Sequence, residues 1–133
     1  MPLQLKLLAL VFLGGGIGST FRYGVTLAAL RLLGIGFPWG TFTVNVVGSA
    51  AMGAFAGWLT SRAPDPGHDA FRLFFMTGIL GGFTTFSAYS LDTVALWEKG
   101  AQTTAIVYAV ASVVISLGVL VAALLTVRGW ATT

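Results

Sequence analysis

The sequence predicts an all-α membrane protein with four transmembrane helices in a single domain, and two features lead to that prediction. Hydrophobic residues make up 56% of the 133 residues and charged residues only 8%, whereas soluble proteins carry about 25% charged residues. Long apolar stretches also divide the chain, each near the roughly 20 residues that cross a bilayer. They predict spans at about residues 5–32, 39–61, 72–96 and 103–127 within one transmembrane domain of residues 1–133.

Short connections join the predicted spans. Residues 33–38 and 97–102 are typical of turns, and residues 62–71 (RAPDPGHDAF) form the one clearly aqueous loop. Basic residues have a small excess on the side of the termini, and this weak positive-inside bias fits two arrangements. Either the termini of every copy are cytoplasmic, or copies insert in both directions, which permits an antiparallel dimer. The basic residues are Lys6, Arg62, Arg72 and Arg128 on the side of the termini, against Arg31 and Lys99.

The third span contains the segment TGILGGFTTFSAYS at residues 77–90. Its adjacent glycines, Gly81 and Gly82, are followed by the hydroxyl residues Thr84 and Thr85, and this composition favours a break in the helix. Unwound backbone in a bilayer must be buried in protein or line a watery cavity, where its freed carbonyls can coordinate a cation. The alternative is a kinked helix without a site, and we favour the break.

Two pairs of glycines stand four residues apart, Gly14 with Gly18 and Gly53 with Gly57. This small-xxx-small spacing lets the backbones of two helices touch. It fits contact between two copies or tight packing within one chain, and we expect packing within one chain.

Isolated polar side chains recur inside the apolar spans. On the fourth span Thr104, Tyr108, Ser112 and Ser116 repeat every four residues, so they share one face of a helix. Such a stripe either holds helices together or lines a file of hydrogen-bond donors. Asn45 adds an amide early in the second span.

Arg22 and Asp92 are charges within the predicted spans. If the helices alternate in direction, both residues lie toward the end opposite the termini. Charged residues inside a membrane pair with one another or line a polar cavity. We expect Arg22 to stand in an aqueous vestibule and attract anions, with Asp92 as its candidate partner.

Several function classes lack the residues that they need. The absence of cysteine excludes disulfides, thiolate metal sites and cysteine nucleophiles. His68 lies in the polar loop together with Asp65 and Asp69, so neither a catalytic triad nor a zinc site can assemble within the spans. No basic stripe suited to nucleic acid is present. We therefore expect a protein that is not an enzyme.

Together these motifs resemble the small bacterial fluoride channels called Fluc or CrcB. The resemblance covers essentially the whole chain and rests on GGGIGSTFRY at residues 14–23, WGTFTVNVVG at residues 39–48 and the segment at residues 77–90. The last two motifs in that order, with Arg22 before them, form a highly specific combination. Two positions depart from the pattern: Ala88 stands where the family commonly has threonine, and Tyr89 where it has a second phenylalanine.

The resemblance implies an antiparallel, dual-topology homodimer in the cell inner membrane, with two fluoride pores at its interface. It also implies a structural Na+ on the two-fold axis, held by backbone carbonyls of Gly81 and Thr84 from both copies. Arg22 corresponds to the vestibule arginine of the family. The pore residues that the resemblance implies are Asn45, Phe86, Ser87, Tyr89, Tyr108, Ser112 and Ser116.

The function that the resemblance implies is passive export of cytoplasmic fluoride through a fluoride-selective channel. Hydroxyl and amide donors and the electropositive edges of aromatic rings are suited to replacing the water around a small anion. One alternative is a small multidrug-resistance-type cation/proton antiporter, which needs an acidic residue in its first helix, whereas residues 5–33 contain none. The other is one subunit of a heterodimeric membrane channel.

Overall fold

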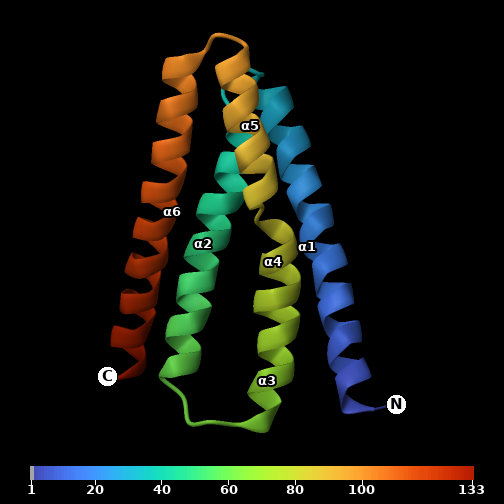
Figure 1. Ribbon diagram of the computed structural model, residues 1–133. Coiled ribbons are helices and arrows are strands. Elements are labelled where there is room, and N and C mark those ends of the chain that lie inside the picture. The colour runs from blue at the N-terminus through green and yellow to red at the C-terminus, as the bar shows by residue number, and fades with distance from the viewer. Residues whose placement is uncertain (1) are drawn as a thin grey trace.

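The computed structural model describes residues 2–133, and all the regular structure in that range is helical (Figure 1). Three long helices are continuous: α1 (Leu3–Leu33), α2 (Trp39–Thr60) and α6 (Gln102–Ala131). The remaining membrane-length segment is divided into α3 (Pro66–Arg72), the π-helix η1 (Leu73–Leu80), α4 (Gly81–Phe83) and α5 (Phe86–Glu98). Both ends of the chain lie at the same end of the bundle, beside α3 (Figure 1).

The predicted all-α chain of four helical segments is confirmed. The three continuous helices are each long and apolar enough to cross a membrane. Their bounds differ slightly from the predicted spans, because a hydrogen-bonded helix need not begin or end where an uncharged run does. The α6 helix, for example, extends to Ala131, four residues beyond the predicted end at residue 127.

The loop predicted at residues 62–71 is shorter than expected, because α3 begins inside it at Pro66. Asp65 caps this helix by accepting a hydrogen bond from the Gly67 N–H at 2.9 Å. Aspartate at the N-cap and proline at the first helical position are both favourable at a helix start. Pro66 therefore begins a helix inside the segment predicted as a loop.

Close packing between helices occurs at the glycines. On α2, a Cβ added to Gly53 or Gly57 would collide with the backbone of α6 at Leu120 or Leu124. On α1, a Cβ on Gly14 or Gly18 would collide with the carbonyl of Phe74 or Ile79 in η1. The expectation that these glycine pairs serve packing within one chain is therefore confirmed, and the bundle contains two closely packed pairs, α2 with α6 and α1 with η1.

The turns opposite the termini depend on left-handed glycines. Gly34 after α1 has φ 77° and Gly100 after α5 has φ 82°, a region in which other residues are strained. Phe37, in the first of these turns, packs edge-on against Tyr108 with ring centroids 5.4 Å apart. This contact ties the turn to α6.

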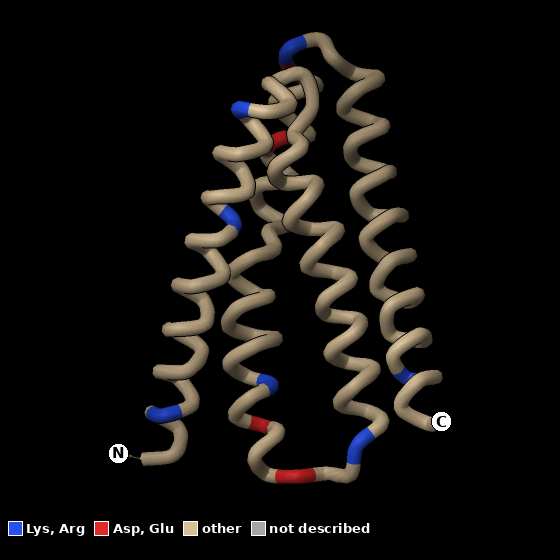
Figure 2. The backbone as a smooth tube through the Cα atoms, turned by 180° about the vertical axis from the view of Figure 1, so that it is seen from behind, with Lys and Arg blue, Asp and Glu red and all other residues tan. Residues whose placement is uncertain are grey.

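Most of the charged residues lie toward the two ends of the bundle, and few lie between them (Figure 2). Among the described residues the one ion pair joins Arg72 to Asp69 at 3.7 Å, within α3. This distribution is that of a chain whose middle is surrounded by lipid, because charge is costly there.

We predict that Gly18→Ala destabilises the protein, because its methyl group would overlap the Ile79 carbonyl of η1. Overpacking of this kind costs roughly 1–3 kcal/mol, so the midpoint of thermal unfolding in detergent should fall. Gly24→Ala on the same helix is the matched control, since a Cβ there meets no atom within 4 Å. Equal midpoints for the two variants would contradict the packing described above.

Candidate functional site

The backbone of the third membrane segment leaves the helical conformation at two adjacent residues. Thr84 has φ −87° and ψ 157°, and Thr85 has φ −153° and ψ 121°. Both conformations are extended. They separate α4 from α5 at the position of the hydroxyl residues that follow Gly81 and Gly82.

Asn45 of α2 holds this extended backbone through a pair of hydrogen bonds. Its side-chain nitrogen donates to the Thr85 carbonyl at 2.9 Å, and its side-chain oxygen accepts from the Thr85 N–H at 2.8 Å. The amide thus satisfies both polar groups of one peptide residue, which water cannot do inside a bilayer.

Thr85 in turn caps α5. Its hydroxyl oxygen accepts a hydrogen bond from the Ala88 N–H at 3.1 Å, and it lies 3.2 Å from the Ser87 hydroxyl. The side chain is buried, with 8% of its surface exposed. Threonine is a favourable N-cap because its oxygen replaces a missing helical acceptor.

These hydrogen bonds release two carbonyl groups from their usual helical donors. In a continuous helix the Gly81 carbonyl would accept from Thr85 and the Thr84 carbonyl from Ala88. Here the Thr85 N–H donates to Asn45 and the Ala88 N–H donates to the Thr85 hydroxyl. Of the two residues that carry these carbonyls, Gly81 is exposed and Thr84 is partly exposed.

An open groove of about 410 Å³ lies beside the break, between α2, α5 and α6. Ser112 and Ser116 of α6 line it, and their hydroxyl oxygens are buried without a hydrogen-bond partner among the described residues. Buried hydroxyls without a partner are rare, so this wall of the groove is suited to a polar occupant. The groove brings together five of the predicted pore residues: Asn45, Phe86, Tyr89, Ser112 and Ser116.

The other two predicted pore residues, Ser87 and Tyr108, do not line this groove. Ser87 is exposed on α5, and its hydroxyl is directed to Thr85. Tyr108 is fully buried, and its hydroxyl donates to the Asp92 carboxylate at 3.2 Å. Tyr108 therefore continues the polar stripe of α6 toward the end opposite the termini.

The Tyr89 ring packs against those of Phe86 and Tyr108, with centroids 5.3 and 5.5 Å away. Its hydroxyl donates to the Ala109 carbonyl of α6 at 2.9 Å. The hydroxyl is thereby occupied, and it connects α5 to α6 beside the groove.

The expected pairing of Arg22 with Asp92 is not formed. Arg22 is partly buried on α1 and has no acidic partner within ion-pair distance in residues 2–133. Asp92 instead accepts the hydrogen bond from Tyr108, because its side chain faces α6. The positive charge of Arg22 is therefore left without a carboxylate beside it.

Sequence reasoning missed the role of Thr85. A hydroxyl residue directly before a resumed helix is the typical N-cap signal, and Thr85 with Phe86 fits that signal once a break is assumed. No local signal predicts the hydrogen-bond partner of Thr85, because Asn45 lies 40 residues earlier in the chain.

A family model described as "CrcB-like protein, Camphor Resistance (CrcB)" matches residues 9–124. The chain belongs to the CrcB family. It is 50% identical over 121 residues to "Fluoride-specific ion channel FluC 2" of Nitrobacter hamburgensis, covering 90% of this chain and 94% of that protein. It is 53% identical over 107 residues to "Fluoride-specific ion channel FluC" of Mesorhizobium japonicum, covering 80% and 84%. It is 47% identical over 119 residues to the protein of the same name from Rhodopseudomonas palustris, covering 90% and 94%.

The CrcB match includes every residue of the break and the groove, from Asn45 to Leu120, and it includes Arg22. Of the two positions that depart from the expected pattern, Ala88 takes part in the break through its backbone N–H alone. The hydrogen bond to Thr85 is thus available to any residue except proline at position 88.

We predict that Asn45→Ala loosens the break, because it removes both hydrogen bonds to Thr85. Leaving buried polar groups without partners costs roughly 1–3 kcal/mol. Amide hydrogen exchange at residues 84–88 should accelerate in the purified protein. The control is Thr126→Ala, which removes a hydroxyl that bonds back to Ala122 of its own helix. Unchanged exchange in Asn45→Ala would mean that the amide does not hold the break.

Proposed function

We propose that the chain is a fluoride-selective channel that exports cytoplasmic fluoride by passive permeation. The observation that carries this proposal is the groove beside the helix break, where two buried serine hydroxyls have no partner among residues 2–133. The names of the relatives as fluoride-specific ion channels support the choice of ion. Hydrogen fluoride enters a cell across the membrane and dissociates in the more alkaline cytoplasm, and the channel then lets the anion leave.

The side chains beside the groove are chemically suited to fluoride. Ser112 and Ser116 each have a hydroxyl without a hydrogen-bond partner in the described part of the chain, and Asn45 retains one side-chain N–H after its bond to Thr85. The rings of Phe86 and Tyr89 have electropositive edges that can face an anion. All these groups are neutral, so an ion can bind and leave again, as conduction requires. Ser87 and Tyr108 extend the proposed path beyond the groove.

Two copies of the chain, inserted in opposite directions, form the proposed channel in the cell inner membrane. The groove is open along one side in a single copy, and a partner packed against that side would close it. Phe86 has 76% of its surface exposed at the edge of the groove, and Gly81 is exposed nearby. An antiparallel pair related by a two-fold axis would contain two such grooves and hence two pores.

A sodium ion at the two-fold axis is part of the proposal. The Gly81 and Thr84 carbonyls have lost their helical donors, as described above, and neutral oxygens of this kind suit a hard cation. The same two carbonyls from each copy would hold the ion. Its chemistry there is structural: it would join the two helix breaks by binding oxygens that lipid cannot satisfy.

Arg22 has the proposed role of attracting anions into an aqueous vestibule, and the absence of an ion pair to Arg22 among residues 2–133 supports this. The antiporter alternative is less well supported, because α1 contains no acidic residue to exchange protons. The relatives are named as channels, and none of those named above is an enzyme.

We predict that proteoliposomes containing the purified protein release fluoride much faster than chloride, as measured with ion-selective electrodes. Ser112→Ala and Ser116→Ala should each slow fluoride release roughly ten-fold or more, because a hydrogen bond to a charged group contributes about 1.5–3 kcal/mol. Ser61→Ala is the control, since its hydroxyl bonds to Trp58 at the end of α2. Equal release of fluoride and chloride by the unmodified protein would refute the proposed selectivity.

We also predict that removing sodium weakens the assembly. When N-methylglucamine replaces Na+ on both sides, fluoride release should fall, and purified dimers should separate into monomers more readily on size-exclusion chromatography. Potassium, which is larger, should restore the dimer less well than sodium. A dimer that is equally stable without any alkali cation would exclude a structural role for the ion.

A further inference from the structure

Two hydroxyl groups face each other where the third membrane segment resumes its helix. The hydroxyl oxygens of Thr85 and Ser87 lie 3.2 Å apart, and either hydroxyl can be the donor. Thr85 is buried, with 8% of its surface exposed, whereas Ser87 is exposed. We call these two residues the hydroxyl pair. The direction of the hydrogen bond within it decides which member keeps a hydrogen for another partner.

The Thr85 hydroxyl depends on Ser87 because its other neighbours are already engaged. Its oxygen accepts from the Ala88 N–H at 3.1 Å, and the Asn45 amide is bonded through both its ends to the Thr85 backbone. Among residues 2–133, Ser87 is the one acceptor within hydrogen-bond distance of this hydroxyl. A buried hydroxyl without an acceptor is costly, so Thr85 donates to Ser87 when no ion is beside it.

Ser87 differs from the next hydroxyl residue of α5 in having no bond back to its own helix. Ser90 donates to the carbonyl of Phe86, four residues earlier, at 2.9 Å. The corresponding carbonyl for Ser87 belongs to Phe83, which lies before the break. The bond of the Ser87 hydroxyl within the described part of the chain is to Thr85. When Thr85 donates, the Ser87 hydrogen therefore points away from it and is available to another acceptor.

The two members of the hydroxyl pair border different spaces. Thr85 lines the groove together with Asn45 and Ser112. Ser87 does not line it and is exposed on the first turn of α5. The first turn of a helix has N–H groups without helical acceptors and the positive end of the helix dipole, so an anion is favoured there too. An ion that moves from the groove to the start of α5 passes from one hydroxyl to the other.

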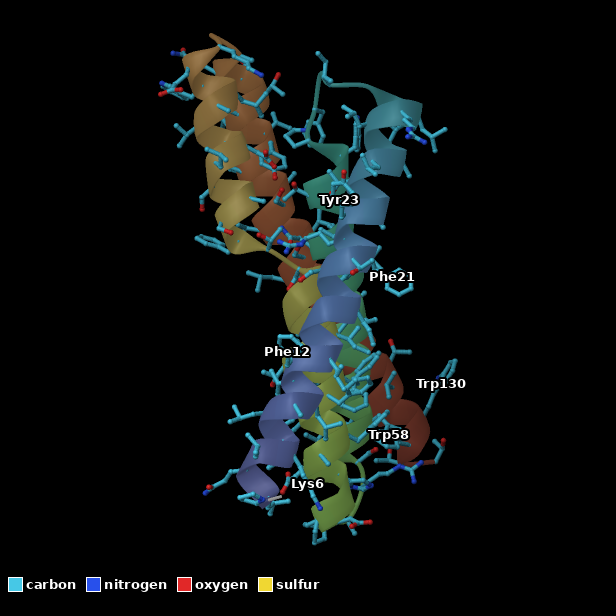
Figure 3. The ribbon with its side chains drawn as sticks, turned by 90° about the vertical axis from the view of Figure 1, so that its right-hand side faces the viewer. Lys6, Phe12, Phe21, Tyr23, Trp58 and Trp130 are labelled. Atoms are coloured by element: carbon cyan, nitrogen blue, oxygen red, sulfur yellow. The ribbon has the colours of Figure 1, made fainter. Side chains whose placement is uncertain are left out.

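The hydroxyl pair lies deep in the bundle, because the break is midway along it, near the level of Phe21 on α1 (Figure 3). Water is scarce at this depth of a membrane, so a hydroxyl that donates to an ion needs protein groups for its remaining bonds. The pair meets this need in both directions. With the ion beside Thr85, Ser87 donates to Thr85, and with the ion beside Ser87, Thr85 donates to Ser87.

We propose that Thr85 is a further fluoride-binding residue, and that the hydroxyl pair reverses its hydrogen bond as the ion passes from the groove to the start of α5. The reversal needs only the rotation of two hydroxyl hydrogens, while the two oxygens keep their 3.2 Å separation. Each hydroxyl is a free donor when the ion reaches it, and neither loses its partner. This inference rests on the proposed fluoride conduction.

A double-mutant cycle, measured by fluoride release from proteoliposomes, tests the proposal. Thr85→Val and Ser87→Ala should each slow release roughly ten-fold, because each removes a hydrogen bond to a charged group. Residues that act as a unit have non-additive effects. The double variant should therefore be about as slow as either single variant, and Thr85→Ser and Ser87→Thr, which keep a hydroxyl, should recover most of the rate.

The matched control is Ser90→Ala, which removes a hydroxyl that bonds within α5 and should leave release unchanged. Loss of the helix cap in Thr85→Val acts without Ser87, so a purely structural role of Thr85 predicts that the two effects multiply, to about a hundred-fold. That result would overturn the proposal. Release from Thr85→Ser as slow as from Thr85→Val would also overturn it, because the hydroxyl would then not be the group that matters.

A titration of the wild type needs no variant and decides the question even if Thr85→Val fails to fold. In NMR spectra of the purified protein, the Cβ resonances of Thr85 and Ser87 should move together with added fluoride and stay in place with chloride. The Ser61 resonance, whose hydroxyl bonds to Trp58, is the control. Movement of Ser87 alone would exclude Thr85 as a binding residue. If the wild type releases fluoride selectively and neither resonance moves, this inference fails while the proposed function stands.

Discussion

The architecture of this protein depends on the pairing of one side-chain amide with one peptide residue. A bilayer offers no water to a helix that unwinds inside it, so both polar groups of Thr85 need a protein partner. Asn45 supplies a donor and an acceptor at once. The released carbonyls of Gly81 and Thr84 and the cap of α5 follow from that pairing.

Glycine packing and the polar groove have complementary roles in the bundle. Glycines bring α1 against η1 and α2 against α6 at backbone distance, and these contacts fix the positions of the helices without polar interactions. The groove then forms where α2, the start of α5 and α6 meet beside the break. Rigid apolar contacts thus position a small set of hydroxyl, amide and aromatic groups, as a binding site for a small ion needs.

A feature of the fold or the site could be predicted from the sequence when residues close together in the chain determine it. The helices followed from apolar length, which is a local property, and the stripe of Tyr108, Ser112 and Ser116 followed from helical spacing. The start of α3 at Pro66 is not predicted, because the two prolines and the polarity of residues 62–71 indicate an aqueous loop, although Asp65 and Pro66 are a helix-start signal. The partners of individual side chains are the hardest feature to predict from the sequence. Arg22 and Asp92 lie toward the same end of the bundle, but the rotation of α5 turns Asp92 to Tyr108.

The hydroxyl of Tyr89 shows that a change of residue type need not change what a binding site presents. Because this hydroxyl is consumed by the Ala109 carbonyl, the cavity is left with a phenyl-like surface from a residue that is nominally polar. Tyrosine and phenylalanine at this position would therefore present the same ring surface to an ion. They would differ in whether a hydrogen bond joins α5 to α6. A substitution between them can change how firmly α5 is joined to α6 without changing the surface that lines the groove.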